Sequence, residues 1–115
     1  MVDQAIIEDV KIYDVFDLWG RKPKQLAFND TDVVIVTAKA GNKEIKETFF
    51  ICLKPDGTFN LKTPSRISRA RREKLARFLR YYFKVNDPEN YNLKEEIKGW
   101  KGKKLDLEGN YIFIP

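Results

Sequence analysis

The chain has 115 residues, of which 43% are hydrophobic and 34% charged, and it carries a formal net charge of +5. This composition is typical of one globular domain, residues 1–115, and excludes a disordered chain. Cys52 is the only cysteine and histidine is absent, which excludes an intrachain disulfide, a cysteine-built metal site and the commonest general base. No apolar run approaches the roughly 20 residues of a membrane span, and the first residues do not resemble a secretory signal. We therefore expect a cytoplasmic protein without a membrane partner.

The first predicted element is a long strand at residues 5–17, where apolar and polar side chains alternate. Ile6, Val10 and Ile12 fall on one face of this strand, and Tyr13 falls on the other, mixed face. The loop that follows combines an aromatic ring with cations: Trp19, Arg21, Lys22 and Lys24. Tyr13 and Trp19 are thus candidates both for the core and for contact with a ligand.

Residues 33–40 and 43–53 form a predicted β-hairpin around a Gly-Asn turn at residues 41–42, since both turn residues tolerate a positive φ angle. If this turn sets the register, Lys39 faces Glu44 across the hairpin, which is a favourable pair of opposite charges.

One face of this hairpin is apolar and is expected to join the core: Val34, Val36, Ala38, Ile45, Phe49, Ile51 and Leu53. The other face is half polar: Val33, Ile35, Thr37, Lys39, Lys46, Thr48, Phe50 and Cys52. A turn at residues 54–57 then returns the chain through a short strand at residues 58–61.

Residues 62–84 hold nine cations and one acid, Glu73, whereas the rest of the chain holds thirteen cations and sixteen acids. The spacing predicts an amphipathic helix, with Thr63 as its N-cap or with Ser68 as the cap of a shorter version. The expected apolar stripe consists of Leu75, Phe78, Leu79, Tyr82 and Phe83, with Ile67 at its edge. The cations opposite this stripe are Arg66, Arg69, Arg77, Arg80 and Lys84. Arg71 falls within the apolar half, so either the first turn extends past the core or the guanidinium reaches a partner beneath the helix.

The C-terminal third is predicted to contain one short helix and a second hairpin. Asn92 followed by Glu95 is typical of a capping box, and Gly99 is placed to end the short helix. Residues 103–108 and 111–115 then form the last two strands, joined by another Gly-Asn turn.

Three strands, a helix and a two-stranded hairpin are the element order of the OB-fold, a five-stranded barrel with a helix between its third and fourth strands. The C-terminal sequence GWKGKKLDLEGNYIFIP also resembles the final hairpin of small OB-fold single-stranded-DNA-binding proteins of phage and archaeal replication systems. The resemblance implies a mainly β fold with one long helix, closed as an OB-like barrel, and single-stranded DNA as the ligand. The alternative is an open antiparallel α+β sheet with the helix packed across it, because the strand at residues 58–61 and the long cationic helix depart from the minimal pattern.

The cations of the predicted helix are candidates for contact with phosphate groups, because the planar guanidinium matches phosphate geometry and a one-signed face repels itself without an anionic partner. Phe50, Tyr13 and Trp19 are candidates for stacking with bases. The full set of expected nucleic-acid-binding residues is Arg66, Arg69, Arg71, Arg72, Arg77, Arg80, Lys46, Phe50, Tyr13, Trp19, Arg21, Lys101 and Lys103. Four other aromatic residues are assigned to the core by their periodicity: Phe49, Phe59, Phe78 and Phe113. The competing interpretation of the helix is a solvated face that keeps the protein soluble.

No motif in the sequence predicts catalysis, a metal or a cofactor. The nearest candidate, Asp32 with Glu44 and Lys46, resembles the Asp…Glu-x-Lys pattern of metal-dependent nucleases, but the inferred hairpin separates the two carboxylates by roughly 23 Å at about 3.3 Å per residue. We therefore expect a non-enzymatic domain that binds single-stranded nucleic acid, DNA in preference to RNA, without a small-molecule substrate. Two alternatives stay open: a protein–protein module, as a homo-oligomer or an accessory or virion component, and a helix that enters the major groove of duplex DNA.

Overall fold

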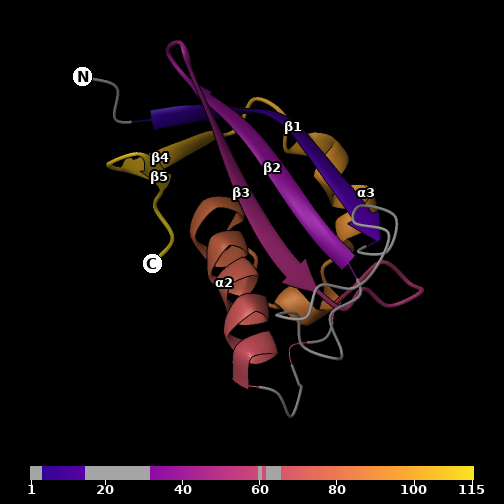
Figure 1. Ribbon diagram of the computed structural model, residues 1–115. Helices are drawn as coiled ribbons and strands as arrows, with labels where there is room; N and C mark the ends of the chain where they lie inside the picture. The colour runs from indigo at the N-terminus through magenta and orange to yellow at the C-terminus, as the bar shows by residue number, and fades with distance from the viewer. Residues whose placement is uncertain (1–3, 15–31, 60, 62–65) are drawn as a thin grey trace.

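The computed structural model describes residues 4–14, 32–59, 61 and 66–115, of which residues 67 and 68 are described by their backbone. Within these ranges an antiparallel sheet curls into a nearly closed five-stranded barrel, and a long helix packs against it (Figure 1). Trp19, Arg21 and the expected helix cap Thr63 lie outside the described residues.

The strands pair in antiparallel fashion in the spatial order β3-β2-β1-β4-β5. They are β1 (Gln4–Asp14), β2 (Asp32–Ala40), β3 (Lys43–Ile51), β4 (Lys104–Glu108) and β5 (Tyr111–Ile112). β1 is the central strand: it pairs with β2 along most of its length, and its first residues pair with the first half of β4. The second half of β4 pairs with β5. This arrangement, with a helix after the third strand, confirms the mainly β architecture and is compatible with an OB-like fold.

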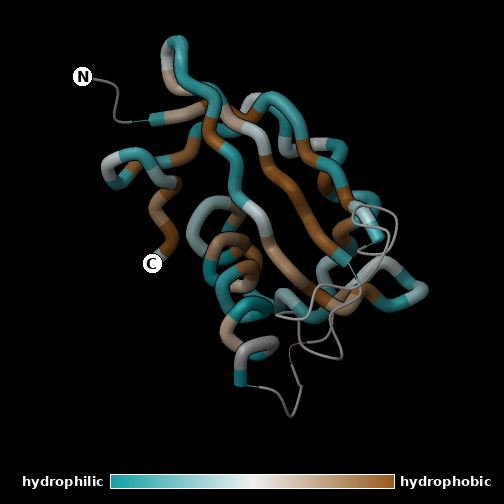
Figure 2. The backbone as a smooth tube through the Cα atoms, in the orientation of Figure 1, coloured by the Kyte–Doolittle hydropathy of each residue, from teal (hydrophilic) through white to brown (hydrophobic). Residues whose placement is uncertain are grey.

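The β2–β3 hairpin has the register that its turn predicts. Lys39 pairs with Glu44, and Gly41 adopts a φ angle of 63° in the turn. The expected apolar face is buried at Val34, Val36, Ala38, Ile45, Phe49 and Ile51, and half-buried at Leu53. Val33 differs from the prediction, since it lies on the half-polar face and yet is fully buried. Figure 2 shows β2 and the end of β3 as hydrophobic, and the beginning of β3 as hydrophilic.

A β-bulge in β1 changes which side chains face the core. The pairing of β1 with β2 shifts between Ile7 and Asp9, and the extra residue of a bulge reverses the alternation beyond it. Ala5 and Ile7 are therefore buried before the bulge, and Val10 packs against the core after it. Ile6, which simple alternation places on the same face as Val10, is 47% exposed. The expectation of one uninterrupted strand face is wrong for Ile6.

The cationic segment forms α2 (Arg66–Phe83), which packs along β3 (Figure 1). Its predicted apolar stripe is confirmed, because Leu75, Phe78, Leu79 and Tyr82 are buried and Phe83 is half-buried. The ring of Phe78 lies at the centre of the aromatic core, with its centroid 5.1 Å from that of Phe49 and 5.6 Å from that of Trp100. Of the other phenylalanines expected in the core, Phe59 is buried and Phe113 is half-buried.

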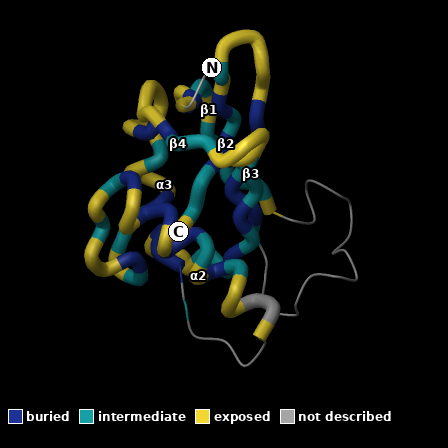
Figure 3. The backbone as a smooth tube through the Cα atoms, turned by 90° about the vertical axis from the view of Figure 1, so that its left-hand side faces the viewer, coloured by how far each residue is buried: buried dark blue, intermediate teal, exposed yellow. Residues whose placement is uncertain are grey.

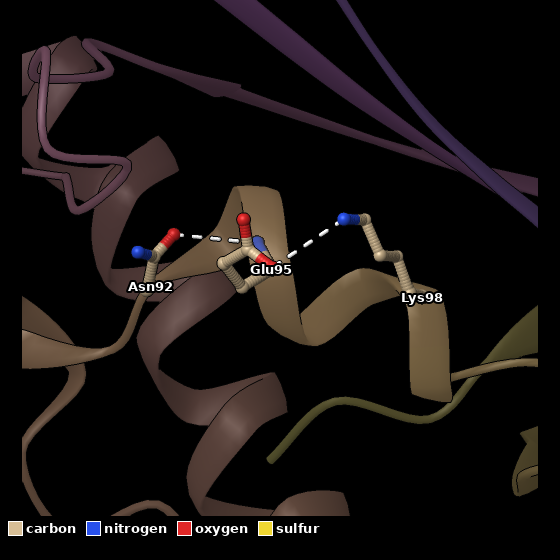
Figure 4. A network of polar contacts seen from close by, with 3 residues as sticks. All are labelled: Asn92, Glu95 and Lys98. Carbon is tan, nitrogen blue, oxygen red and sulfur yellow. Dashed lines mark hydrogen bonds and ion pairs between the residues drawn. The ribbon is translucent and has the colours of Figure 1, made fainter.

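The described part of the chain contains two α-helices, not the one long helix of the predicted fold class. The second is α3 (Leu93–Glu96), a single turn flanked by the 3-10 turns η1 (Pro88–Asn90) and η2 (Ile97–Gly99). Asn92 caps α3 as expected, because its Oδ1 accepts a hydrogen bond from the Glu95 N–H at 3.3 Å, while the carboxylate of Glu95 pairs with Lys98 at 3.4 Å (Figure 4). Neither α2 nor α3 is long and apolar enough to cross a membrane.

The turn after β3 packs against the start of α3. Gly57 has a φ angle of +91°, and its carbonyl oxygen accepts the Leu93 N–H at 2.9 Å. Where a short strand is expected at residues 58–61, the described residues form one bridge between Leu53 and Phe59. This turn thereby joins the edge strand β3 to α3.

Trp100 and Tyr82 connect the C-terminal part of the chain to the core. Trp100 is 1% exposed, and its Nε1 donates a hydrogen bond to the Tyr91 hydroxyl at 3.0 Å. The hydroxyl of Tyr82 on α2 donates to the carbonyl oxygen of Phe113 at 2.5 Å and accepts from the N–H of Asp106 at 3.1 Å. Figure 3 shows the buried segments gathered inside the molecule and the exposed ones at hairpin tips and outer turns.

Candidate nucleic-acid interface

The outer side of α2 is cationic. Its four exposed cations, on the side opposite the buried stripe, are Arg66, Arg69, Arg77 and Arg80, and the exposed Lys84 follows the last residue of the helix. Within the described part of the chain, no carboxylate forms an ion pair with Arg66, Arg77 or Arg80. These three guanidinium groups can therefore meet an anionic partner without first breaking an ion pair with the chain's own described carboxylates.

Arg72, which was expected to contact phosphate, does not belong to this outer side. It is 1% exposed. Helical spacing explains the position, because Arg72 lies three residues before Leu75 and four before Ala76, and both of these are buried. The protein encloses the Arg72 side chain, so its position does not agree with contact to a bound strand.

Arg71 lies at the border between the buried and the exposed sides of α2. Its Cζ atom lies over the ring of Phe50, 5.0 Å from the centroid. Of the two alternatives for Arg71, a partner beneath the helix is therefore correct, and this partner is an aromatic ring on the edge strand β3. A base that stacks on Phe50 has to share the ring with this guanidinium.

Lys74 is neutralised within the chain. Its Nζ forms an ion pair with Oε1 of Glu47 on β3, and the same Nζ is 5.2 Å from the ring centroid of Phe49. The Glu47 side chain is 14% exposed. Lys74 thus attaches α2 to β3, and the exposed arginines carry the charge that is left for a partner.

An open groove, here called the seam groove, lies where the barrel is not closed by strand pairing. Among the described strands, β3 pairs with β2 and β5 pairs with β4, but β3 and β5 do not pair with each other. They approach one another nevertheless, and Nζ of Lys43 hydrogen-bonds Oδ1 of Asn110 in the β4–β5 turn. The seam groove has a volume of about 660 Å³. Besides the Lys74–Glu47 pair, its lining includes Lys46, Thr48, Arg77, Glu108, Tyr111 and Ile112.

The seam groove brings together Lys46 and Arg77, two residues of the expected set that lie on different elements. It also contains Tyr111, which is 74% exposed and which sequence reasoning missed. The sequence did contain a signal for the exposure of Tyr111. The next residue, Ile112, is apolar and would be expected in the core, and successive side chains of a strand point to opposite faces. The structure agrees, since Ile112 is 5% exposed.

A second group of expected residues lies on the outer face of the sheet. Tyr13 of β1 and Phe50 of β3 both pair with Val33 of β2, so the three lie in one row across the sheet. A hollow of about 310 Å³ on this face is lined by Asp9, Lys11, Tyr13, Ile35, Thr37 and Lys46. Lys46 lines both this hollow and the seam groove, because it lies on the edge strand between them.

The outer face of the sheet carries balanced charges, unlike the outer side of α2. Lys11 pairs with Asp9 at 3.7 Å, and Lys46 pairs with Glu44 at 3.8 Å. More than half of each of these side chains is exposed, so the pairs are weak and a stronger anion can replace the carboxylate.

The lysines of the C-terminal segment lie at another place on the surface. Lys101 and Lys103 are both exposed. Nζ of Lys103 is 5.6 Å from the ring centroid of Phe83, the last residue of α2. The structure therefore brings Lys103 to the C-terminal end of α2.

The described residues contain no group of three or more His, Cys, Asp or Glu side chains that could hold a metal ion. The hairpin register places Asp32 opposite Ile51 and Glu44 opposite Lys39, as the argument against the nuclease pattern required. Asp32 has a structural contact instead, because its Oδ2 accepts the Leu53 N–H at 3.1 Å.

Comparison with known proteins adds no family to these observations. No match was found among protein-family models, curated proteins or solved structures. Charge, exposure and the geometry of the seam groove are therefore the observations on which a functional proposal rests.

Proposed function

We propose that this domain binds single-stranded nucleic acid, DNA in preference to RNA, through the outer side of α2 and the seam groove. One observation carries the proposal: Arg77 of α2 and Lys46 of β3 line the same groove as the exposed ring of Tyr111. Cations that hold the backbone beside a ring on which bases stack are the usual means by which proteins bind single strands.

Phosphate contacts supply most of the expected affinity. Arg66, Arg77 and Arg80 are exposed and, as far as the structure describes the chain, form no ion pair that a phosphate would have to displace. Each phosphate neutralised on a single strand steepens the log–log dependence of affinity on salt by about 0.7. Three to five such contacts correspond to a slope of about −2 to −3.5. Because every nucleotide carries the same phosphate, little sequence preference is expected.

A single strand suits these residues better than a duplex. The faces of paired bases are hidden in the stack of a duplex, whereas an unpaired base can reach a ring such as Tyr111. The preference for DNA follows from the resemblance of the C-terminal hairpin to single-stranded-DNA-binding proteins, and RNA of matching sequence is the comparison that tests it.

Fluorescence anisotropy with a labelled oligo-dT strand tests the proposal. Unlabelled single-stranded DNA, the matching RNA and the matching duplex are then added as competitors. The proposal predicts that single-stranded DNA competes best and duplex worst. A labelled strand that shows no binding at about 50 mM salt, where phosphate contacts are strong, contradicts the proposal.

A protein-docking surface is the second candidate. Among the described strands, the edges of β3 and β5 on either side of the seam groove are unpaired, and an unpaired edge can add a further strand. The charged residues of β3 argue against a docking surface, because charged side chains protect a strand edge from the addition of another strand. These residues are Lys43, Glu44, Lys46 and Glu47. Size-exclusion chromatography with and without oligonucleotide distinguishes the two. A tight oligomer that ignores the oligonucleotide favours docking.

A further inference from the structure

We infer that the seam groove holds one nucleotide of the bound strand, with its base stacked on Tyr111 and its flanking phosphates on Arg77 and Lys46. The inference rests on the proposed function and adds a position, a stacking residue and an orientation to it. It differs from the expectation drawn from the sequence, in which Phe50, Tyr13 and Trp19 were the stacking residues.

Tyr111 is the best placed of the described aromatic residues to stack on a base. It is 74% exposed, whereas Tyr13 and Phe50 are half-buried and Phe50 already has the Arg71 guanidinium over its ring. Its backbone is held by the pairing with Glu108 and by the buried side chain of Ile112. A ring on a fixed backbone loses little conformational freedom when a base stacks on it.

The charges in the seam groove are distributed so that they orient the nucleotide. Lys46 and Arg77 attract phosphate, and Glu47 is already neutralised by Lys74. Glu108 pairs with Tyr111 across β4 and β5, so the two side chains lie on one face of the hairpin. Its carboxylate repels a phosphate placed over Tyr111. The base is therefore expected at Tyr111 and the phosphates on the side of Lys46 and Arg77.

The size and walls of the seam groove fit this ligand. It has a volume of about 660 Å³ and is open to solvent, so it can hold one nucleotide without enclosing it. Thr48 supplies a hydroxyl group for a hydrogen bond, and the half-buried Ile114 supplies apolar surface in the wall of the groove. The groove is open, so the strand can continue in both directions.

Two variants of Tyr111 test the inference, with affinity measured for the same labelled oligo-dT. Tyr111→Ala is expected to weaken binding roughly 5- to 150-fold, which is the range for loss of one stacked base. Tyr111→Phe keeps a ring and should bind within about twofold of the wild type. Since no charge is removed, both variants should retain the wild-type salt slope, whereas Arg77→Gln should make it shallower by about 0.7. Thermal unfolding of each variant checks that the fold is kept, as is expected for an exposed residue.

Photo-crosslinking gives an independent result for the wild-type protein. An oligonucleotide that carries 5-iododeoxyuridine is irradiated in the complex, and the adduct is mapped by mass spectrometry to a peptide. The expected adduct is at Tyr111. If the wild type binds no oligonucleotide, the proposed function itself fails. If the wild type binds but Tyr111→Ala binds equally well, or if the adduct lies at Tyr13 or Phe50, the position in the seam groove is wrong while the proposed function stands.

Discussion

The guanidinium of Arg71 lies over the ring of Phe50, with its Cζ atom 5.0 Å from the ring centroid. The two residues belong to α2 and to the edge strand β3, so this contact extends the attachment of the helix beyond the buried stripe. It explains why an arginine occurs in the apolar half of the helix. The contact also directs the Arg71 guanidinium toward β3 and away from the outer cationic side of α2.

A double-mutant cycle with Arg71→Ala and Phe50→Leu measures this contact. The expected coupling is about 0.5–1 kcal/mol in the free energy of unfolding, which is typical of a partly exposed cation–π pair. Urea unfolding of the two single variants and of the double variant gives the value. The same cycle with Arg80→Ala, which changes an exposed residue, should give no coupling. Additive effects in the Arg71 cycle would show that the ring and the guanidinium do not interact.

Gly57→Ala should destabilise the protein by about 1–3 kcal/mol. The φ angle of +91° disfavours any other residue, and a Cβ atom there would lie 2.2 Å from Oδ1 of Asn92, the atom that caps α3. Gly99→Ala is the matched control, because its Cβ would meet nothing within 4 Å. Its effect should stay within about 0.5 kcal/mol. Equal melting temperatures for the two variants would contradict the described packing of the turn on α3.

Glu47→Gln should strengthen oligonucleotide binding and weaken folding. The substitution releases Lys74 from its ion pair, so the seam groove gains one cation that can contact phosphate. The salt slope should become steeper by about 0.7, and the free energy of unfolding should fall by about 1 kcal/mol, because the Lys74 side chain is still 37% exposed. Glu95→Gln makes the same change in net charge at the ion pair between Glu95 of α3 and Lys98 of η2. If both variants change binding equally, the effect is one of net charge and not of the groove.

Tyr82 should make the stability sensitive to alkaline pH. Burial raises the pKa of Tyr82 to about 12, well above the ordinary value of a tyrosine hydroxyl. The raised pKa means that the folded state holds the hydroxyl proton more tightly than the unfolded state. The resulting contribution to stability is complete below about pH 10 and is lost as the pH rises to about 12. Urea unfolding measured from about pH 8 to about pH 12, a range that includes the ordinary pKa of tyrosine, gives the loss of stability.

Tyr82→Phe is the control for this pH dependence. The variant lacks the hydroxyl that bonds Phe113 and Asp106, so it should be less stable by about 1 kcal/mol at neutral pH. Its stability should fall less steeply above pH 10. Parallel curves for the variant and the wild type would contradict the role assigned to the buried hydroxyl.

Local chemistry in the sequence was sufficient for much of the fold. The Gly-Asn turn set the register that pairs Lys39 with Glu44, and the helical spacing identified the buried stripe around Phe78. The errors have physical causes. Ile6 was misplaced because a bulge in β1 reverses the alternation, and nothing in the local pattern marks it. Arg72 was named as a phosphate contact from its charge alone, although its spacing from Leu75 places it beside the buried stripe.

The candidate site was less predictable than the fold, because it depends on how distant elements meet. Arg77 and Lys46 could be named from their charge, but their shared groove exists because the barrel stays open between β3 and β5. Tyr111 was assigned to a strand without regard to its exposure. The neutralisation of Lys74 by Glu47 likewise depends on a contact between α2 and β3 that the sequence does not specify.

The dependence of oligo-dT affinity on salt tests the central claim most directly, in the wild type and in two double variants of equal charge. Arg77→Glu with Arg80→Glu reverses the outer side of α2. Lys94→Glu with Lys98→Glu reverses two exposed cations, one on α3 and one on η2. We predict a wild-type log–log salt slope of about −2 to −3.5. Loss of two phosphate contacts should make the slope of the Arg77/Arg80 variant shallower by about 1.4. The slope of the Lys94/Lys98 variant should stay nearly unchanged. Equal slopes for the two variants, or a wild-type affinity that does not respond to salt, would contradict the central claim.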